Sequence, residues 1–136
     1  MGVLTVLLER AENLKDTDML GGGKSDPYVL LEVEQDNLII DKDFGEKRST
    51  VKKDDLNPVY NETFTWELPT LNNMKLWVKV MDEDNRKFMD DDFLGKDFLN
   101  LEKVKPTSEF KEHKLKVENR LIKKDAFVYI KVKYEA

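Results

Sequence analysis

Carboxylates are concentrated in one short stretch of the chain, residues 82–92. Five of these side chains are Asp and one, Glu83, is Glu. The stretch follows residues 75–81, where apolar and polar side chains alternate as in a half-buried strand, so the carboxylates begin at a strand end. A folded protein holds so many like charges together only with a compensating cation. Oxygen ligands without Cys or His suit calcium better than zinc or copper, so we expect a calcium site here.

A second group of acids lies in the connection between the first two expected strands. Asp18 precedes the run Gly21-Gly22-Gly23, and Asp26 precedes Pro27. The glycines allow a sharp bend and the proline fixes the entry into the next strand, so this loop could bring both carboxylates to one ion. Asp and Gly are also ordinary loop residues, so this loop alone leaves a purely structural role open.

Short strands must position these loops. Apolar runs separated by turn-rich pieces predict eight strands, at residues 2–9, 26–34, 47–53, 61–68, 75–81, 93–100, 110–116 and 126–134. Strands this short need a second sheet to cover their apolar faces, which predicts an all-β, eight-stranded antiparallel sandwich. Residues 99–104 could hold one helical turn. A chain of 136 residues has the size of one domain, so we expect a single domain over residues 1–136.

Composition narrows the class of partner and the compartment. The formal net charge is −5 and the pI about 5.0, which argues against nucleic acid as a partner because nucleic-acid binders carry basic patches. There is no Cys, which favours a reducing compartment. Neither a signal-peptide pattern nor an apolar run of about 18 residues is visible. These features predict a cytoplasmic location.

Four short motifs, in this order along the chain, resemble those of C2 domains. They are Ser25-Asp26-Pro27-Tyr28-Val29, Leu56-Asn57-Pro58-Val59-Tyr60-Asn61-Glu62-Thr63-Phe64, Asp82-Glu83-Asp84 and Asp92-Phe93-Leu94-Gly95. The resemblance implies a Greek-key β-sandwich that binds calcium at loops on one end and then docks on phospholipid membranes. Because strands are expected at residues 2–6 and 127–133, the chain resembles the circular permutation called type II, as in novel protein kinases C and phospholipases C.

The resemblance also implies a set of calcium ligands. They are Asp18 and Asp26 from the first loop, and Asp82, Asp84 and Asp92 from the later one. All five positions are acidic here, whereas many C2 domains that lack these acids bind proteins without calcium. Both loops are slightly longer than the family pattern, which leaves the ligand register open. Three neighbouring acids could substitute for an assigned ligand, namely Asp16, Asp90 and Asp91.

Apolar and basic side chains lie beside these acids, and the resemblance places them toward a membrane. They are Met19, Leu20, Arg86, Lys87, Phe88 and Met89. Apolar side chains exposed on loops often mark an interaction surface, and basic ones attract anionic headgroups. The alternative is that Leu20 or Phe88 folds back onto the sandwich.

A phosphoinositide patch, which some C2 domains carry on the concave sheet, is incomplete here. Lys47 and Arg48 are its candidate residues. Leu30 and Glu32 stand where such a lysine cluster would need further positive charge. A solvated strand face is the alternative role for these two basic residues.

The sequence gives less support to other functions. An EF-hand that starts at Asp82 would place Lys87 where glycine is required and Phe93 where glutamate is required. His113 is the sole histidine and there is no Cys, so the usual Ser-His or Cys-His catalytic arrangements have little material and we do not expect an enzyme, although two carboxylates could do acid-base work. The sequence therefore predicts a calcium-dependent module that becomes peripherally bound to anionic, phosphatidylserine-like membranes when calcium rises. A calcium-independent module with protein partners is the alternative.

Overall fold

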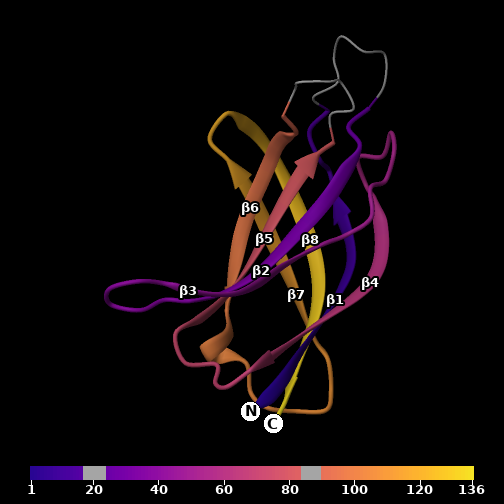
Figure 1. Cartoon of the computed structure of the whole chain (residues 1–136). Helices are drawn as coiled ribbons and strands as arrows, with labels where there is room; N and C mark the ends of the chain where they lie inside the picture. Colours follow the sequence, from indigo (N-terminus) through magenta and orange to yellow (C-terminus); the bar gives the residue numbers. More distant parts are fainter. Residues whose placement is uncertain (17–23, 84–89) are drawn as a thin grey trace.

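The computed structural model describes residues 1–16, 24–83 and 90–136. Within these residues the regular elements are β1 (Gly2–Glu12), β2 (Pro27–Gln35), β3 (Lys42–Arg48), β4 (Val59–Leu68), β5 (Met74–Asp82), β6 (Asp92–Asn100), the short 3-10 helix η1 (Leu101–Lys103), β7 (Lys111–Asn119) and β8 (Ile122–Glu135). All the strand pairs are antiparallel (Figure 1). No helix in the described part of the chain is long and apolar enough to cross a bilayer.

Two four-stranded sheets form the sandwich. One has the order β3-β2-β5-β6 and the other the order β7-β8-β1-β4. A bridge between Lys96 of β6 and Glu118 of β7 links them along one edge. The first strand, β1, pairs with both β4 and the last strand, β8, so the two chain ends lie side by side (Figure 1). The predicted all-β, eight-stranded sandwich of type II topology is confirmed.

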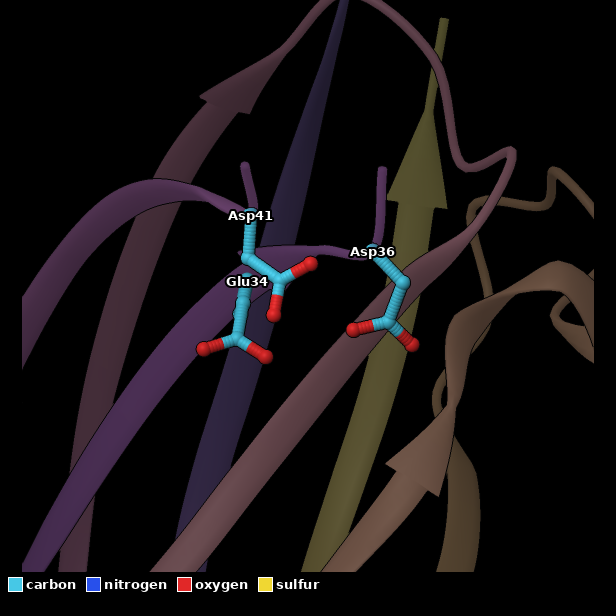
Figure 2. Close-up of side chains that lie close together, drawn as sticks. All are labelled: Glu34, Asp36 and Asp41. Atoms are coloured by element: carbon cyan, nitrogen blue, oxygen red, sulfur yellow. The ribbon is translucent and has the colours of Figure 1, made fainter. Parts of the chain in front are cut away.

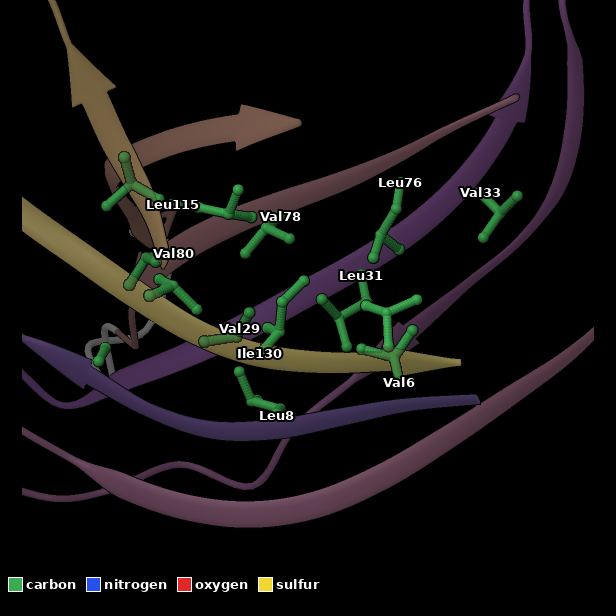
Figure 3. Packing of buried hydrophobic residues seen from close by; sticks show 14 of the residues in the cluster. Val6, Leu8, Val29, Leu31, Val33, Leu76, Val78, Val80, Leu115 and Ile130 are labelled. Carbon is green, nitrogen blue, oxygen red and sulfur yellow. The ribbon is translucent and has the colours of Figure 1, made fainter. Parts of the chain in front are cut away.

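Alternating side chains fill the space between the sheets. Every second side chain of β5 from Met74 to Val80 is fully buried. Every second side chain of β8 from Ala126 to Tyr134 is at most 6 % exposed. Figure 3 shows side chains of β1 and β8 meeting those of β2 and β5. Each such Val or Leu contributes roughly 1.5–3 kcal/mol when it leaves water, so this interior holds the strand ends in place.

The predicted position of the third strand is wrong. β3 begins at Lys42 and ends at Arg48, whereas residues 47–53 were predicted. Its one large apolar side chain is Phe44, and since an edge strand can be charged on both faces, the apolar pattern missed it. After Arg48 the regular ladder stops, since the Val29 N–H donates to the Ser49 side chain at 2.8 Å instead of to a backbone carbonyl.

The other strands match the prediction apart from their ends. β1 runs on to Glu12, β7 runs on to Asn119, and β8 starts at Ile122. The helical turn expected within residues 99–104 is η1. Its first turn is capped by the Asn100 side chain, which accepts the N–H of Glu102 at 3.1 Å.

Candidate functional site: the acidic end of the sandwich

Three of the five predicted calcium ligands lie at one end of the sandwich, on neighbouring strands. Asp26 directly precedes β2, Asp82 is the last residue of β5, and Asp92 is the first residue of β6. Asp82 pairs directly with Asp92 in the sheet. Because β2, β5 and β6 are adjacent, these carboxylates start from one edge of one sheet. The other two predicted ligands, Asp18 and Asp84, lie outside the described residues.

Asp82 is the most buried of the three carboxylates, with only 1 % of its surface exposed. Its Oδ1 atom accepts the backbone N–H of Asp26 at 2.7 Å. The next N–H along the chain, that of Glu83, donates to the Asp26 carbonyl at 3.0 Å. These two bonds tie the start of β2 to the end of β5. A buried charge is costly unless it is paired, so a carboxylate held here by hydrogen bonds is suited to a cation.

A third connection, between β3 and β4, also reaches this end, and the sequence did not reveal it. The N–H of Asp54 donates to Asp26 Oδ1 at 2.8 Å, and Asp54 Oδ1 accepts the N–H of Lys24 at 3.0 Å. Asp54 has φ of 52°, a left-handed conformation that Asp tolerates better than most residues. Asp55 donates its N–H to the Ser25 carbonyl at 3.1 Å. In the sequence, the two consecutive acids Asp54 and Asp55 were the signal that could have revealed this third connection.

The substitute ligands Asp16, Asp90 and Asp91 lie at the same end, and a hydrogen bond fixes the position of Asp91. The Tyr28 hydroxyl donates this bond to Asp91 Oδ2. Burial, followed by the bond to Asp91, raises the pKa of Tyr28 to about 12, so this hydroxyl stays protonated at neutral pH. Asp91 is therefore held against β2, whereas Asp90 and Asp92 are exposed.

The two candidate phosphoinositide residues are not brought together. As neighbours in β3, Lys47 and Arg48 point to opposite faces. Lys47 lies over the Trp66 ring at 5.6 Å, and Arg48 lies over the Tyr28 ring at 3.8 Å. Arg48 also forms an ion pair of 3.1 Å with Glu83. The phosphoinositide patch stays a prediction. Arg48 instead pairs with Glu83 at the acidic end.

The expected membrane contacts lie outside the described residues. They are Met19, Leu20, Arg86, Lys87, Phe88 and Met89. They belong to the β1–β2 and β5–β6 connections, whose flanking strand ends, at β2 and at β5 and β6, lie at the acidic end (Figure 1).

A separate acidic group, which the sequence did not single out, lies at the β2–β3 hairpin (Figure 2). Carboxylate oxygens of Glu34, Asp36 and Asp41 lie within 4.8 Å of one another, an approach that Asp26, Asp82 and Asp92 do not reach among the described residues. Burial and the charges of Asp41 and Asp36 raise the pKa of Glu34. Lys75 offsets one charge through a 2.9 Å ion pair with Asp36.

These two acidic groups are far apart. Asp26 precedes β2 and Glu34 lies near its end, which separates them by about 26 Å along the strand at about 3.3 Å per residue. The acids that flank residues 37–40 were the signal for the hairpin group. The described residues thus present two separate acidic groups, one at each end of β2.

Comparison with known proteins decides the family. The C2 domain family matches residues 2–118 of this chain. This chain belongs to the C2 domain family. Synaptotagmin-1 from Homo sapiens is 41% identical over 98 residues, which make up 72% of this chain and 22% of that protein. The chain thus spans about a fifth of the length of the curated relatives that it matches.

Solved C2 domains share the whole fold. A C2 domain of plant Extended Synaptotagmin 1 superposes with a TM-score of 0.82 at 26% identity, over 98% of this chain and 94% of that one. A calcium-bound structure of two C2 domains of Extended-Synaptotagmin 2 gives 0.72 at 26% identity, over 98% of this chain and 45% of that one. The resemblance seen in the sequence is confirmed, and the general class is a phospholipid-binding, membrane-targeting module.

The buried carboxylate of Asp82 generates a prediction about stability in the absence of calcium. Asp82→Asn keeps an oxygen that can accept the Asp26 N–H, whereas Asp82→Ala removes this acceptor. We expect Asp82→Ala to lower the free energy of unfolding by about 1–3 kcal/mol and Asp82→Asn to lower it much less. Urea denaturation in a calcium chelator measures both.

Asp92→Ala is the matched control, because Asp92 is exposed at the neighbouring position. It should change the unfolding free energy little. Equal destabilisation by all three substitutions would contradict a special structural role for Asp82.

Proposed function

We propose that this C2 domain binds anionic phospholipid membranes in a calcium-dependent manner. The supporting observation is the set of acids on three neighbouring strand ends, with Asp82 buried among the connections of one end of the sandwich. Oxygen-only side chains in such a cluster are the ligands that calcium prefers. The chain acts as a single C2 unit over residues 1–136 and moves to the membrane surface when calcium rises.

The residues proposed to hold calcium are Asp18, Asp26, Asp82, Asp84 and Asp92. When bound, the metal neutralises these carboxylates and offers open coordination positions to phosphate or carboxylate oxygens of lipids. Without it, the carboxylates repel an anionic leaflet. The hydrogen bonds among Asp26, Asp54 and Asp82 hold these three positions together before any cation arrives, which lowers the ordering cost of binding at these positions.

The membrane-facing residues are proposed to be those of the same two connections. Phe88, Met89, Met19 and Leu20 supply apolar side chains, and Arg86 and Lys87 supply positive charge. A basic residue near an anionic leaflet contributes about 1 kcal/mol. Calcium thus removes the repulsion, and these side chains provide the attraction.

A calcium-independent protein-interaction module is the second candidate, and one observation favours it. Leu38, Ile39 and Ile40 at the β2–β3 hairpin tip are 106, 92 and 77 % exposed. Acidic residues flank this tip, which disfavours an anionic membrane as its partner. A protein partner with an apolar pocket and a basic rim fits these side chains better.

Co-sedimentation with vesicles tests calcium dependence. Vesicles that contain phosphatidylserine should pellet the protein with calcium and release it with a chelator, because the metal reverses the repulsion. Asp82→Asn should weaken the calcium-dependent binding at least about tenfold, which corresponds to ~1.4 kcal/mol.

Asp41→Asn is the matched control for that experiment. It removes one charge from the hairpin group and should leave vesicle binding unchanged. Equal binding with and without calcium would contradict the calcium switch. Absence of any vesicle binding would favour the protein-interaction module.

The apolar residues of the later connection provide a separate prediction. Phe88→Ala combined with Met89→Ala should leave calcium binding in solution nearly unchanged. It should weaken calcium-dependent vesicle binding at least about tenfold, because each fully inserted side chain contributes roughly 1.5–3 kcal/mol. Calorimetric calcium titration and co-sedimentation measure the two effects separately.

Leu38→Ala combined with Ile39→Ala is the control, since it removes exposed apolar surface at the hairpin tip. Vesicle binding should be unaffected by this pair. Unchanged binding by the Phe88 and Met89 double variant would mean that the connection meets the membrane through its ions alone.

A further inference from the structure

A cleft opens between the two sheets at the end that holds the chain termini. β6 and β7 meet at Lys96 and Glu118, where a Cβ added to Gly95 would lie 3.1–3.2 Å from the β7 backbone. Beyond this contact β6 continues to Asn100 and η1, and the chain enters β7 only at Lys111. The strands diverge and leave a cavity of about 430 Å³. Pockets for small molecules measure about 300–1,000 Å³, so the cleft is large enough for one.

The β7 wall of this cleft has unexpected polarity. Alternate residues of a strand share a face, and Leu115 and Val117 of β7 point into the core with 7 and 3 % exposure. Lys111 and His113 continue the same inward-facing row, and both line the cleft. A core row that changes from apolar to basic breaks the pattern of the sandwich, and such breaks are expected at functional positions.

The remaining walls combine an apolar floor with a basic rim. Leu99, Val104 and the buried Val132 supply the apolar surface. Lys103 and Lys105 join Lys111 at the rim. Within the part of the chain that the structure describes, no acidic side chain lines the cleft.

The three rim lysines differ from most lysines of the fold. Others form ion pairs, as Lys131 does with Glu9, or lie over aromatic rings, as Lys114 does over Phe127. Among the described residues, Lys103, Lys105 and Lys111 have neither kind of partner. Their positive charges are available to a ligand.

The pKa of His113 is also affected by this positive charge. Burial, followed by the positive charge of Lys111, lowers the pKa of the imidazole. The neighbouring Glu112 points to the opposite face of β7, where it lies opposite Lys131, so it does not offset the charge in the cleft. A negative group that entered the cleft would be attracted by the lysines and would favour the protonated imidazole.

We propose that this cleft binds a small anionic amphiphile, a carboxylate or phosphate head joined to an apolar chain. The head would contact Lys103, Lys105 and Lys111, and the chain would lie on Leu99, Val104 and Val132. The cleft is at the end of the sandwich opposite the acidic connections, so this binding does not require calcium. A domain docked on a membrane through its acidic end would keep the cleft open to solution.

His113 provides a direct test, because it is the one histidine of the chain and its Hε1 proton gives a single NMR signal. Decanoate, kept below its micelle concentration and added in a calcium chelator, should shift this signal saturably and raise the His113 pKa. Lys103→Gln combined with Lys111→Gln should weaken decanoate binding by about tenfold or more, the factor that corresponds to ~1.4 kcal/mol.

Lys53→Gln combined with Lys123→Gln is the matched control, since both lysines are exposed away from the cleft. It should leave decanoate affinity unchanged. Inorganic phosphate tests binding through a negative charge without an apolar tail. Decyl maltoside tests binding through a ten-carbon apolar tail without a charge. Both should bind much more weakly than decanoate. The proposal is overturned if decanoate leaves His113 unshifted, if either single-feature probe binds equally well, or if the two lysine pairs have equal effects.

Discussion

The hydrogen bond from the Asp26 N–H to the buried carboxylate of Asp82 is the contact on which the acidic end depends. It joins the first residue before β2 to the last residue of β5, and Asp54 then fastens the β3–β4 connection to Asp26. Three acidic residues from distant parts of the sequence are thereby held together at this end. Because a buried carboxylate is stable only with partners, these hydrogen bonds are what allow Asp82 to be buried at this end of the fold.

The strand order explains why the two ends of the sandwich differ. At the acidic end, β2, β5 and β6 meet side by side and present their acids together. At the other end, β6 and β7 separate beyond the bridge between Lys96 and Glu118. One end therefore gathers the acids of three strands, and the other opens a cleft with basic side chains between β6 and β7, on a different edge from the acidic β2–β3 hairpin group. A chain with a net charge of −5 can carry both surfaces because strands of about nine residues hold them roughly 26 Å apart.

Most of the fold could be predicted because the alternation of apolar and polar residues follows the alternation of buried and exposed side chains. β5 and β8 bury every second residue, and their sequences alternate accordingly. β3 could not be placed, because its charged side chains are compatible with either face of an edge strand. The pairing of β6 with β7, which produces the cleft, depends on tertiary packing that no local pattern encodes.

The site could be predicted in part for a similar reason. Strand prediction placed Asp26, Asp82 and Asp92 at strand ends, and the resemblance to C2 domains implied one common end, which the order β2-β5-β6 gives them. The role of Asp54 depends on a hydrogen bond across 28 residues of sequence, and the hairpin group depends on how residues 37–40 turn. The basic residues Lys111 and His113 stand out only once Leu115 and Val117 are known to face the core.

Calcium is proposed to bind at the acidic end rather than at the hairpin group. A residue-resolved NMR titration with calcium tests it, because backbone amide shifts report where the ion binds. We expect the largest, saturable shifts at residues 16–26, 53–55 and 82–92, with little change at residues 34–41. Shifts confined to residues 34–41, or no saturable shift up to millimolar calcium, would contradict the account.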